Sequence, residues 1–180
     1  MTVPTTAPAT WHGVLLRVDG LGVLLCGDSG SGKSELALEL VSRGHRLVAD
    51  DCVELEVAAD GSLVGRSPHG LGRFLEVRDL GILDIQRLYG EQAVLAEQRL
   101  DLIIRLERDA APAADRLHGR RESITVCGIP LPLLCLGRAR ERSLAVLVEC
   151  AVRTELARRD GYDAAQELAN RLRQRMDRSP

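Results

Sequence analysis

Residues 27–34 constrain the fold of this chain more than any other segment, because they fit the pattern G-x4-G-K-[ST]. The apolar stretch GVLLC precedes them, and KSELALELVSR, with apolar residues at helical spacing, follows. This context predicts a strand, a phosphate-binding loop (P-loop) and a helix in succession. Glycines let backbone N–H groups point at phosphate oxygens, and the helix N-terminus favours negative charge. A Gly/Ser-rich turn without a ligand is the weaker alternative.

The P-loop also holds the single lysine, Lys33, among the 24 Lys and Arg residues of the chain. Lysine is a compact point charge and arginine a planar fork, so a lone lysine is expected where a point charge is required. In a P-loop this lysine reaches the β- and γ-phosphates, and the hydroxyl of Ser34 binds Mg²⁺. The predicted nucleotide-binding residues are Gly27, Asp28, Ser29, Gly30, Ser31, Gly32, Lys33 and Ser34.

The rest of the chain reads as a mixture of hairpins and helices. Turn dipeptides between apolar runs predict hairpins around residues 19–20, 60–61 and 127–128. The continuous apolar run LDLIIRLE indicates a strand covered on both faces of its sheet. These features predict an α/β fold: a P-loop-containing mixed β-sheet with flanking helices.

Two helices are predicted near the C-terminus. Ser143 is expected to cap a helix that runs to about Arg159. Asp163 and Gln166 form a sequence like a capping box, which starts a last helix over 164–176. We expect one catalytic domain over residues 11–180, preceded by a disordered tail over residues 1–10.

Composition excludes several classes of protein. The 180 residues suffice for one domain with a substantial core, and a net charge of −2 favours neither nucleic acid nor membrane as a partner. No apolar run is long enough to span a membrane, and the N-terminus lacks the features of a secretory signal. The five cysteines form no CxxC pair, so free thiols in the cytoplasm are expected, and no residue set has zinc-ligand spacing.

The stretch LVADD supplies two carboxylates, Asp50 and Asp51, at the end of a predicted strand. Adjacent residues of a strand point to opposite faces, so these two aspartates cannot do the same task. One is expected to face the γ-phosphate, while the other meets a metal ion or a neighbouring side chain. A solvated turn at the end of the strand is the alternative.

Taken together, several segments in order resemble the C-terminal catalytic domain of bacterial HPr kinase/phosphorylase over about residues 11–175. They are WHGV, the P-loop, LVADDCVEL, FLEVRDLGILDI, RLDLIIRLE, ADRL and SLAVLVECAV. The resemblance implies a kinase fold like that of phosphoenolpyruvate carboxykinase, in a short form without the N-terminal domain of that family. It implies an ATP- and Mg²⁺-dependent serine kinase of the phosphocarrier protein HPr that forms homohexamers. The same resemblance leaves open a second activity, in which phosphate removes the phosphoryl group and pyrophosphate is released.

The resemblance also implies roles for single residues. Asp51 corresponds to the catalytic carboxylate, a proton acceptor in phosphorylation and a donor in the reverse reaction. His12 corresponds to a histidine beside that carboxylate, and Arg116 to an active-site arginine. Glu76 corresponds to a second Mg²⁺ ligand alongside Ser34.

Two departures from the family pattern matter. Asp79 stands where the family signature has Gly; Asp tolerates left-handed backbone but adds negative charge near the phosphates. The stretch LGRARER matches only in part the family pattern linked to dephosphorylation, so kinase activity is the firmer expectation. Two other functions remain open from the sequence: a P-loop kinase for another protein or a small hydroxyl compound, and a nucleotide-sensing module without phosphoryl transfer.

Overall fold

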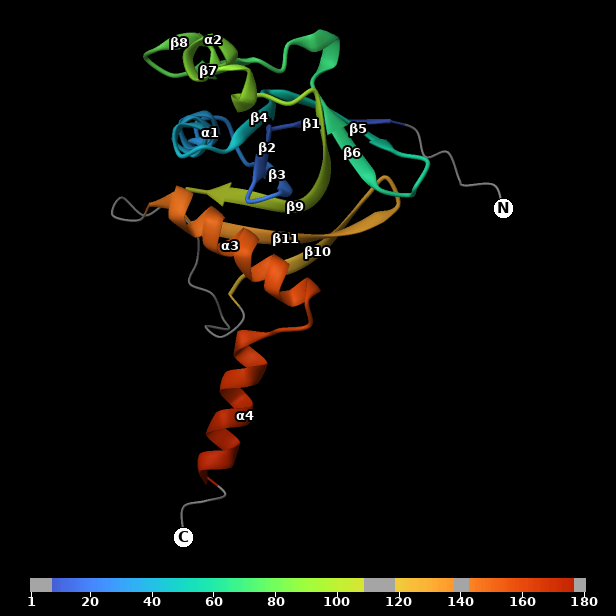
Figure 1. Cartoon of the computed structure of the whole chain (residues 1–180), viewed down its shortest axis with the longest axis vertical. Coiled ribbons are helices and arrows are strands. Elements are labelled where there is room, and N and C mark those ends of the chain that lie inside the picture. The colour runs from blue at the N-terminus through green and yellow to red at the C-terminus, as the bar shows by residue number, and fades with distance from the viewer. Residues whose placement is uncertain (1–7, 109–118, 138–142, 177–180) are drawn as a thin grey trace.

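The computed structural model describes residues 8–108, 119–137 and 143–176 (Figure 1). Its strands are β1 (Ala9–His12), β2 (Val14–Val18), β3 (Leu21–Cys26), β4 (Arg46–Ala49), β5 (Cys52–Val57), β6 (Leu63–Arg66), β7 (Phe74–Val77), β8 (Gly81–Asp84), β9 (Glu97–Glu107), β10 (Arg121–Val126) and β11 (Ile129–Gly137). Its α-helices are α1 (Lys33–Ser42), α2 (Ile85–Tyr89), α3 (Leu144–Arg159) and α4 (Ala164–Met176). Short 3₁₀ turns cover Pro68–Gly70 and Glu91–Ala93.

Most strands belong to one mixed sheet, with the order β1-β5-β6-β9-β3-β2-β4 and the β10–β11 hairpin added through β11. The long strand β9 runs parallel to β3 and β11 and antiparallel to β6. The hairpin β7–β8 is a separate two-stranded sheet, and β7 lies beside α1. The predicted mixed sheet with flanking helices is confirmed.

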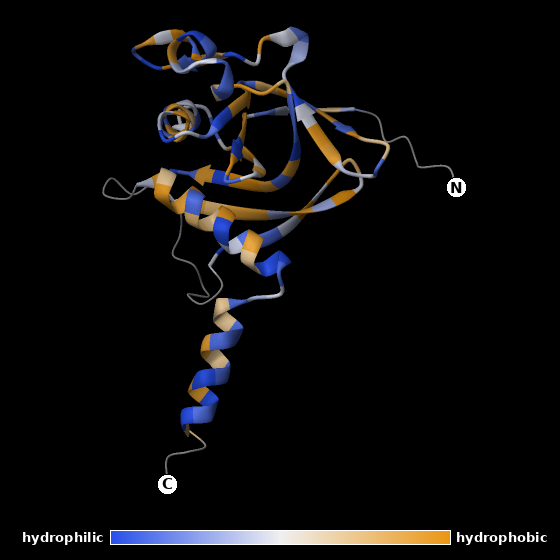
Figure 2. Ribbon diagram, in the orientation of Figure 1, coloured by the Kyte–Doolittle hydropathy of each residue, from blue (hydrophilic) through white to orange (hydrophobic). Residues whose placement is uncertain are grey.

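Apolar side chains cover both faces of the centre of this sheet. All six residues of β3 are buried, as are most of β9. One apolar layer lies between the sheet and α1, α3 and β7, and the other lies on the opposite face, where β5 and β6 curl over it. Figure 2 shows the central strands as predominantly hydrophobic ribbons. A strand with apolar residues on both sides requires this arrangement, so the strand covered on both faces that LDLIIRLE predicts is confirmed.

The three predicted hairpins and both predicted C-terminal helices are present. Asp19 has φ 46° and Cys127 has φ 49°, the left-handed backbone that the tight turns β2–β3 and β10–β11 need. The side chain of Ser143 accepts a hydrogen bond from the backbone N–H of Val146 and caps α3. The side chain of Asp163 accepts from the N–H of Ala165 at the start of α4.

The expected disordered tail over residues 1–10 is wrong for its last part. Ala9 and Thr10 belong to β1, and they pair with Leu55 and Glu54 of β5 in antiparallel register. Small residues suffice here because the backbone of β5, rather than apolar burial, supplies the partners of this edge strand. Residues 1–7 lie outside the described part of the chain.

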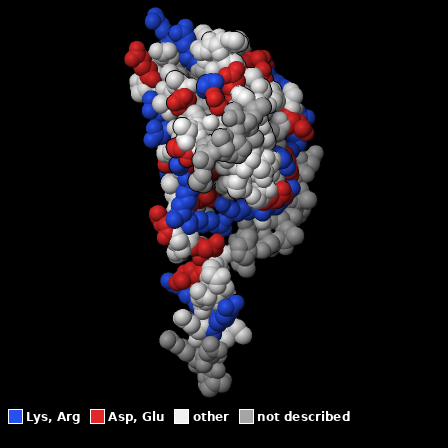
Figure 3. Space-filling view, turned by 90° about the vertical axis from the view of Figure 1, so that its right-hand side faces the viewer, with Lys and Arg blue, Asp and Glu red and all other residues white. Residues whose placement is uncertain are grey.

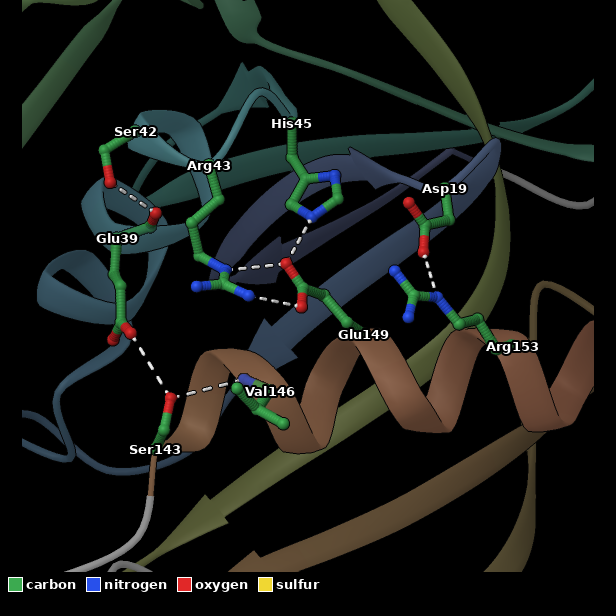
Figure 4. Close-up of polar contacts among 9 residues, drawn as sticks. All are labelled: Asp19, Glu39, Ser42, Arg43, His45, Ser143, Val146, Glu149 and Arg153. Atoms are coloured by element: carbon green, nitrogen blue, oxygen red, sulfur yellow. Dashed lines mark hydrogen bonds and ion pairs between the residues drawn. The ribbon is translucent and has the colours of Figure 1, made fainter.

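A polar cluster joins the C-terminal end of α1 to α3 (Figure 4). The guanidinium of Arg43 donates two hydrogen bonds of 2.7 Å to the carboxylate of Glu149. The Nε2 of His45 lies 3.0 Å from the same carboxylate. One turn further along α3, Arg153 donates to Asp19 in the β2–β3 turn at 2.9 Å. The bonds from Arg43 and His45 join the end of α1, whose other end carries Lys33, to α3, and the bond from Arg153 joins α3 to the sheet.

Helix α4 extends away from the body of the molecule, and none of its residues is buried (Figure 1). Leu168, Leu172 and Met176 recur at intervals of four residues and are all exposed, so they form an apolar stripe without a partner in the described chain. Figure 3 shows acidic and basic side chains intermixed over the face that it draws. Among the described residues, no helix combines the length and the hydropathy needed to cross a membrane.

Replacing Glu149 by Gln tests the junction between α1 and α3. Its hydrogen bonds from Arg43, above all, lower the pKa of Glu149 from 4.5 to about 2. Because the folded-state pKa is depressed, the stabilisation is fully present above pH 4.5 and is lost as the pH falls towards 2. We expect Glu149→Gln to lower the free energy of unfolding by about 2 kcal/mol at pH 7, measured by urea denaturation.

The matched control is Glu167→Gln, which removes the exposed pair between Glu167 and Arg171 on α4. Its expected cost is below about 0.5 kcal/mol. The difference in stability between Glu149→Gln and the parent chain should shrink below pH 4.5, the ordinary pKa of the group. An unchanged difference between neutral pH and pH 3 would contradict this account of the junction.

Candidate active site

The topology brings three strand ends to one edge of the sheet. Strands β3 and β9 are parallel, and β4 runs in their direction because both β3 and β4 pair antiparallel with β2. The carboxyl ends of all three therefore meet, which is where ligands bind in α/β sheets. The P-loop follows β3, and Asp50 and Asp51 follow β4.

The P-loop is held tightly against the end of β9. Gly27 has φ 136°, and a Cβ atom there would lie 2.4 Å from the carbonyl oxygen of Leu106, so only glycine fits. The backbone N–H of Ser31 donates to the carbonyl of Asp28 at 3.1 Å and closes the loop. Helix α1 begins at Lys33, within the last residues of the loop, so the N–H groups of its first turn face the same region.

Lys33 reaches back over its own loop. Its Nζ donates to the carbonyl oxygen of Gly27 at 2.8 Å and to that of Asp28 at 3.1 Å, and the residue is buried. A lysine held at a loop whose backbone can cradle phosphate is a ready cation for that ligand. Phosphate oxygens are stronger acceptors than carbonyl oxygens, so a bound phosphate would compete for the ammonium group.

Asp51 and His12 form a pair on the opposite side of the site. His12 Nδ1 lies 2.9 Å from Asp51 Oδ1, and because a carboxylate only accepts, the nitrogen is the donor. The pairing of β1 with β5 places His12 opposite Cys52, the residue after Asp51. The backbone N–H of Gly13 also donates to the carbonyl of Asp51 at 3.1 Å. Strand β1, which the sequence analysis missed, is thus what brings the two side chains together.

Asp50 turns to a different partner. Its Oδ2 accepts a hydrogen bond of 2.8 Å from the backbone N–H of Glu76, on β7. Burial raises the pKa of the Asp50 carboxyl. The two neighbouring aspartates have different partners. Both follow the last residue of β4, and Asp51 has left-handed backbone with φ 63°, so strand alternation does not set their directions. Asp50 therefore ties the β7–β8 hairpin, which lies outside the main sheet, to the end of β4.

One pocket of about 450 Å³ collects these groups. The predicted site residues that line it are His12, Ser29, Gly30, Gly32, Lys33, Ser34, Asp51 and Glu76. Gly27 and Asp28 stand behind it as acceptors for Lys33, and Ser31 is buried in the loop. Arg116 lies outside the described residues.

The charge of the pocket calls for a cation between protein and phosphate. Asp50, Asp51, Glu76 and Asp79 all line it, and they would repel an anionic ligand. Ser34 and Glu76 offer the oxygen ligands that Mg²⁺ prefers. Within the described residues, no three His, Cys, Asp or Glu side chains lie close enough to hold a metal ion alone. The residues fit an ion that shares its shell with phosphate oxygens and water, as Mg²⁺ does.

The pocket also contains residues that the sequence analysis did not assign. Arg78 and Gly81 line the pocket. Arg78 belongs to the LEVR motif, and its place in that motif could have identified it as a site residue. Asp79 has φ 68°, so the aspartate does adopt the left-handed backbone expected at the family's glycine position. No sequence pattern linked Asp50 to Glu76, since 26 positions separate them.

Comparison with known proteins points in one direction. The model of the family described as HPr Serine kinase C-terminal domain matches residues 5–172. HPr kinase/phosphorylases of Aromatoleum aromaticum and Geobacillus thermodenitrificans are each 46% identical to this chain and match 94% of it. The chain covers 55% and 54% of these two proteins, so it spans about half the length of the curated relatives it matches. The structure of the Hpr(Ser) kinase/phosphatase from Coxiella burnetii superposes with a TM-score of 0.80 at 31% identity, over 89% of this chain and 98% of that one.

Removing the carboxylate of Asp50 tests its link to Glu76. In Asp50→Ala the N–H of Glu76 loses its acceptor, so we expect its amide hydrogen to exchange about tenfold faster or more. Hydrogen exchange followed by NMR measures this. Asp60→Ala, which removes a comparable bond to Ser62 in the β5–β6 turn, is the control and should leave Glu76 unchanged. Equal exchange at Glu76 in Asp50→Ala and in the parent chain would show that the bond does not hold the hairpin.

Proposed function

The chain belongs to the family of the HPr serine kinase C-terminal domain, and from this premise we propose that it transfers the terminal phosphoryl group of ATP to a serine of HPr. The observation that carries the proposal is the single pocket shared by Lys33, on the P-loop, and the hydrogen-bonded pair of Asp51 and His12. A phosphate-binding loop alone supports only nucleotide binding. A carboxylate that faces the same space adds the proton acceptor that transfer to a hydroxyl needs.

In the forward reaction, Asp51 accepts the proton of the serine hydroxyl as its oxygen attacks the γ-phosphorus of ATP. The bond from phosphorus to the β,γ-bridging oxygen breaks, and ADP leaves with the bridging oxygen. His12 donates to Oδ1 of Asp51 and so keeps that carboxylate oriented. Lys33 turns from the carbonyls of Gly27 and Asp28 to the phosphates and offsets their charge.

Ser34 and Glu76 are the proposed Mg²⁺ ligands, with Asp50 holding the backbone of Glu76 in place. An Mg²⁺ ion held by these two residues would offset the negative charge of a bound nucleotide's phosphates. Arg116 is proposed as a further cation of the site on the resemblance alone.

The reverse activity uses the same groups. We propose that an oxygen of inorganic phosphate attacks the phosphorus of the phosphoserine of HPr. The bond from that phosphorus to the serine oxygen breaks, Asp51 in its protonated form donates a proton to the serine oxygen, and the products are pyrophosphate and the free serine of HPr. The bond between serine oxygen and phosphorus that breaks here is the bond that forms in the kinase reaction, so the residue that accepts the serine proton there is the natural donor here. The names of the relatives, kinase/phosphorylase and kinase/phosphatase, support this second activity.

HPr and further copies of the chain are the proposed partners, with a homohexamer as the assembly and the cytoplasm as the location. The exposed stripe of Leu168, Leu172 and Met176 on α4 supports a protein partner, because a stripe of this kind is normally covered. Arg171 and Arg175 follow Leu168 and Leu172 by three residues, so basic side chains flank the stripe.

Transfer of label from γ-labelled ATP to HPr, with Mg²⁺ present, tests the proposal. The parent chain should produce acid-stable phosphoserine on HPr, and Lys33→Ala should not. Asp51→Asn should lower the rate by about 10²-fold to 10⁴-fold while nucleotide affinity changes little, since only the proton acceptor is lost. Asp60→Asn, an exposed carboxylate in the distant β5–β6 turn, should transfer label at the parent rate.

Transfer by Asp51→Asn at the parent rate would remove Asp51 from the mechanism. Label that appears on a small hydroxyl compound and never on HPr would replace the substrate. Tight ATP binding with no transfer to any acceptor would instead favour a nucleotide-sensing module.

A further inference from the structure

Two guanidinium groups meet at the P-loop from outside it. Arg108 directly follows β9, and its Nη2 donates a hydrogen bond of 2.8 Å to the carbonyl oxygen of Ser29. A Cβ atom at Gly30 would lie 2.3 Å from Nη2 of Arg108 and 3.3 Å from Nη2 of Arg78. Both groups thus lie against the same glycine, and the two nitrogens are within about 6 Å of each other, a distance at which like charges repel.

No carboxylate in the described part of the chain forms an ion pair with either group, although several arginines elsewhere in the molecule do pair with carboxylates. Both Arg78 and Arg108 are exposed, so neither is held there by packing. Because both cations converge on a phosphate-binding loop, an anion bound there would offset the repulsion between them. Phosphate is the anion that the loop itself is shaped to bind.

Glycine at position 30 is part of the same arrangement. Any side chain there would displace the guanidinium of Arg108, and the φ of 73° also favours glycine. The loop therefore leaves room for an arginine that the P-loop pattern does not include. A guanidinium has five N–H donors, and Arg108 uses one of them in the hydrogen bond to Ser29. Its other donors can bind a ligand.

We propose that Arg108 binds the terminal phosphates of the nucleotide, anchored to the P-loop through Ser29 and acting opposite Arg78. This inference rests on the proposed function, because it presumes a nucleotide at the P-loop. Its planar fork can donate two parallel hydrogen bonds to phosphate, which Lys33, a point charge beneath the loop, does not offer. Arg108 is distinct from Arg116, the arginine that the family resemblance places in the site.

Calorimetric titration with β,γ-methylene-ATP and Mg²⁺, and separately with pyrophosphate, tests this assignment on the full chain. Arg108→Gln keeps a neutral donor for Ser29 and loses the charge and the fork. We expect it to weaken binding of both ligands about tenfold, and Arg108→Lys to restore part of the loss. Arg87→Gln is the matched control: it removes the same charge from an exposed arginine of α2, which lines a separate pocket, and should change affinity less than twofold.

This experiment distinguishes an Arg108 that only holds the shape of the loop from an Arg108 that binds phosphate. If Arg108 only shapes the loop, Arg108→Gln will bind both ligands within twofold of the parent chain, and the proposal is overturned. Failure of the parent chain to bind either ligand would overturn it as well. If the parent binds the analogue and Arg108→Gln binds it tenfold more weakly, the assignment stands even where no label reaches HPr, so the two proposals fail separately.

Discussion

The parallel pairing of β3 with β9 is the constraint on which the rest of the structure depends. Gly22 packs so closely on β9 that a Cβ atom would lie 1.8 Å from the carbonyl oxygen of Arg99, and its N–H donates to the buried carboxylate of Asp101 at 2.9 Å. Arg159, from the end of α3, donates to the same carboxylate at 2.9 Å. The charge of Asp101 is therefore paired where it is buried, and it joins both strands to the helix that covers them.

The site follows from where these strands end. The P-loop begins at Gly27, against the last residues of β9, and Arg108 follows the other strand of the pair. Elements outside this centre bring the remaining groups: β1 brings His12 to Asp51, and the β7–β8 hairpin brings Glu76 to Asp50. The buried strand pair β3–β9 thus supports the phosphate-binding loop. Strand β1 and the β7–β8 hairpin carry His12 and Glu76, which are proposed for proton transfer and metal binding.

The sequence predicts what depends on local order. The P-loop, the hairpins and the start of α3 at Ser143 each have a short-range physical cause, such as turn conformation or capping, and each was found. Contacts between distant segments were not predictable from such patterns. The strand Ala9–His12 has only four residues and no alternation of buried and exposed apolar residues long enough to mark it, and Arg108 belongs to no motif. The bond from Glu76 to Asp50 joins a separate hairpin to the main sheet, and only the folded chain shows it.

The account's central claim is that one pocket binds the nucleotide through the P-loop and presents Asp51 to its γ-phosphate. A crystal structure of the chain with β,γ-methylene-ATP and Mg²⁺ tests this most directly. We expect Lys33 Nζ to leave the carbonyls of Gly27 and Asp28 for the phosphates, and the ion to contact Ser34 and Glu76. A γ-phosphate that lies away from Asp51, or a nucleotide bound outside this pocket, would contradict the account.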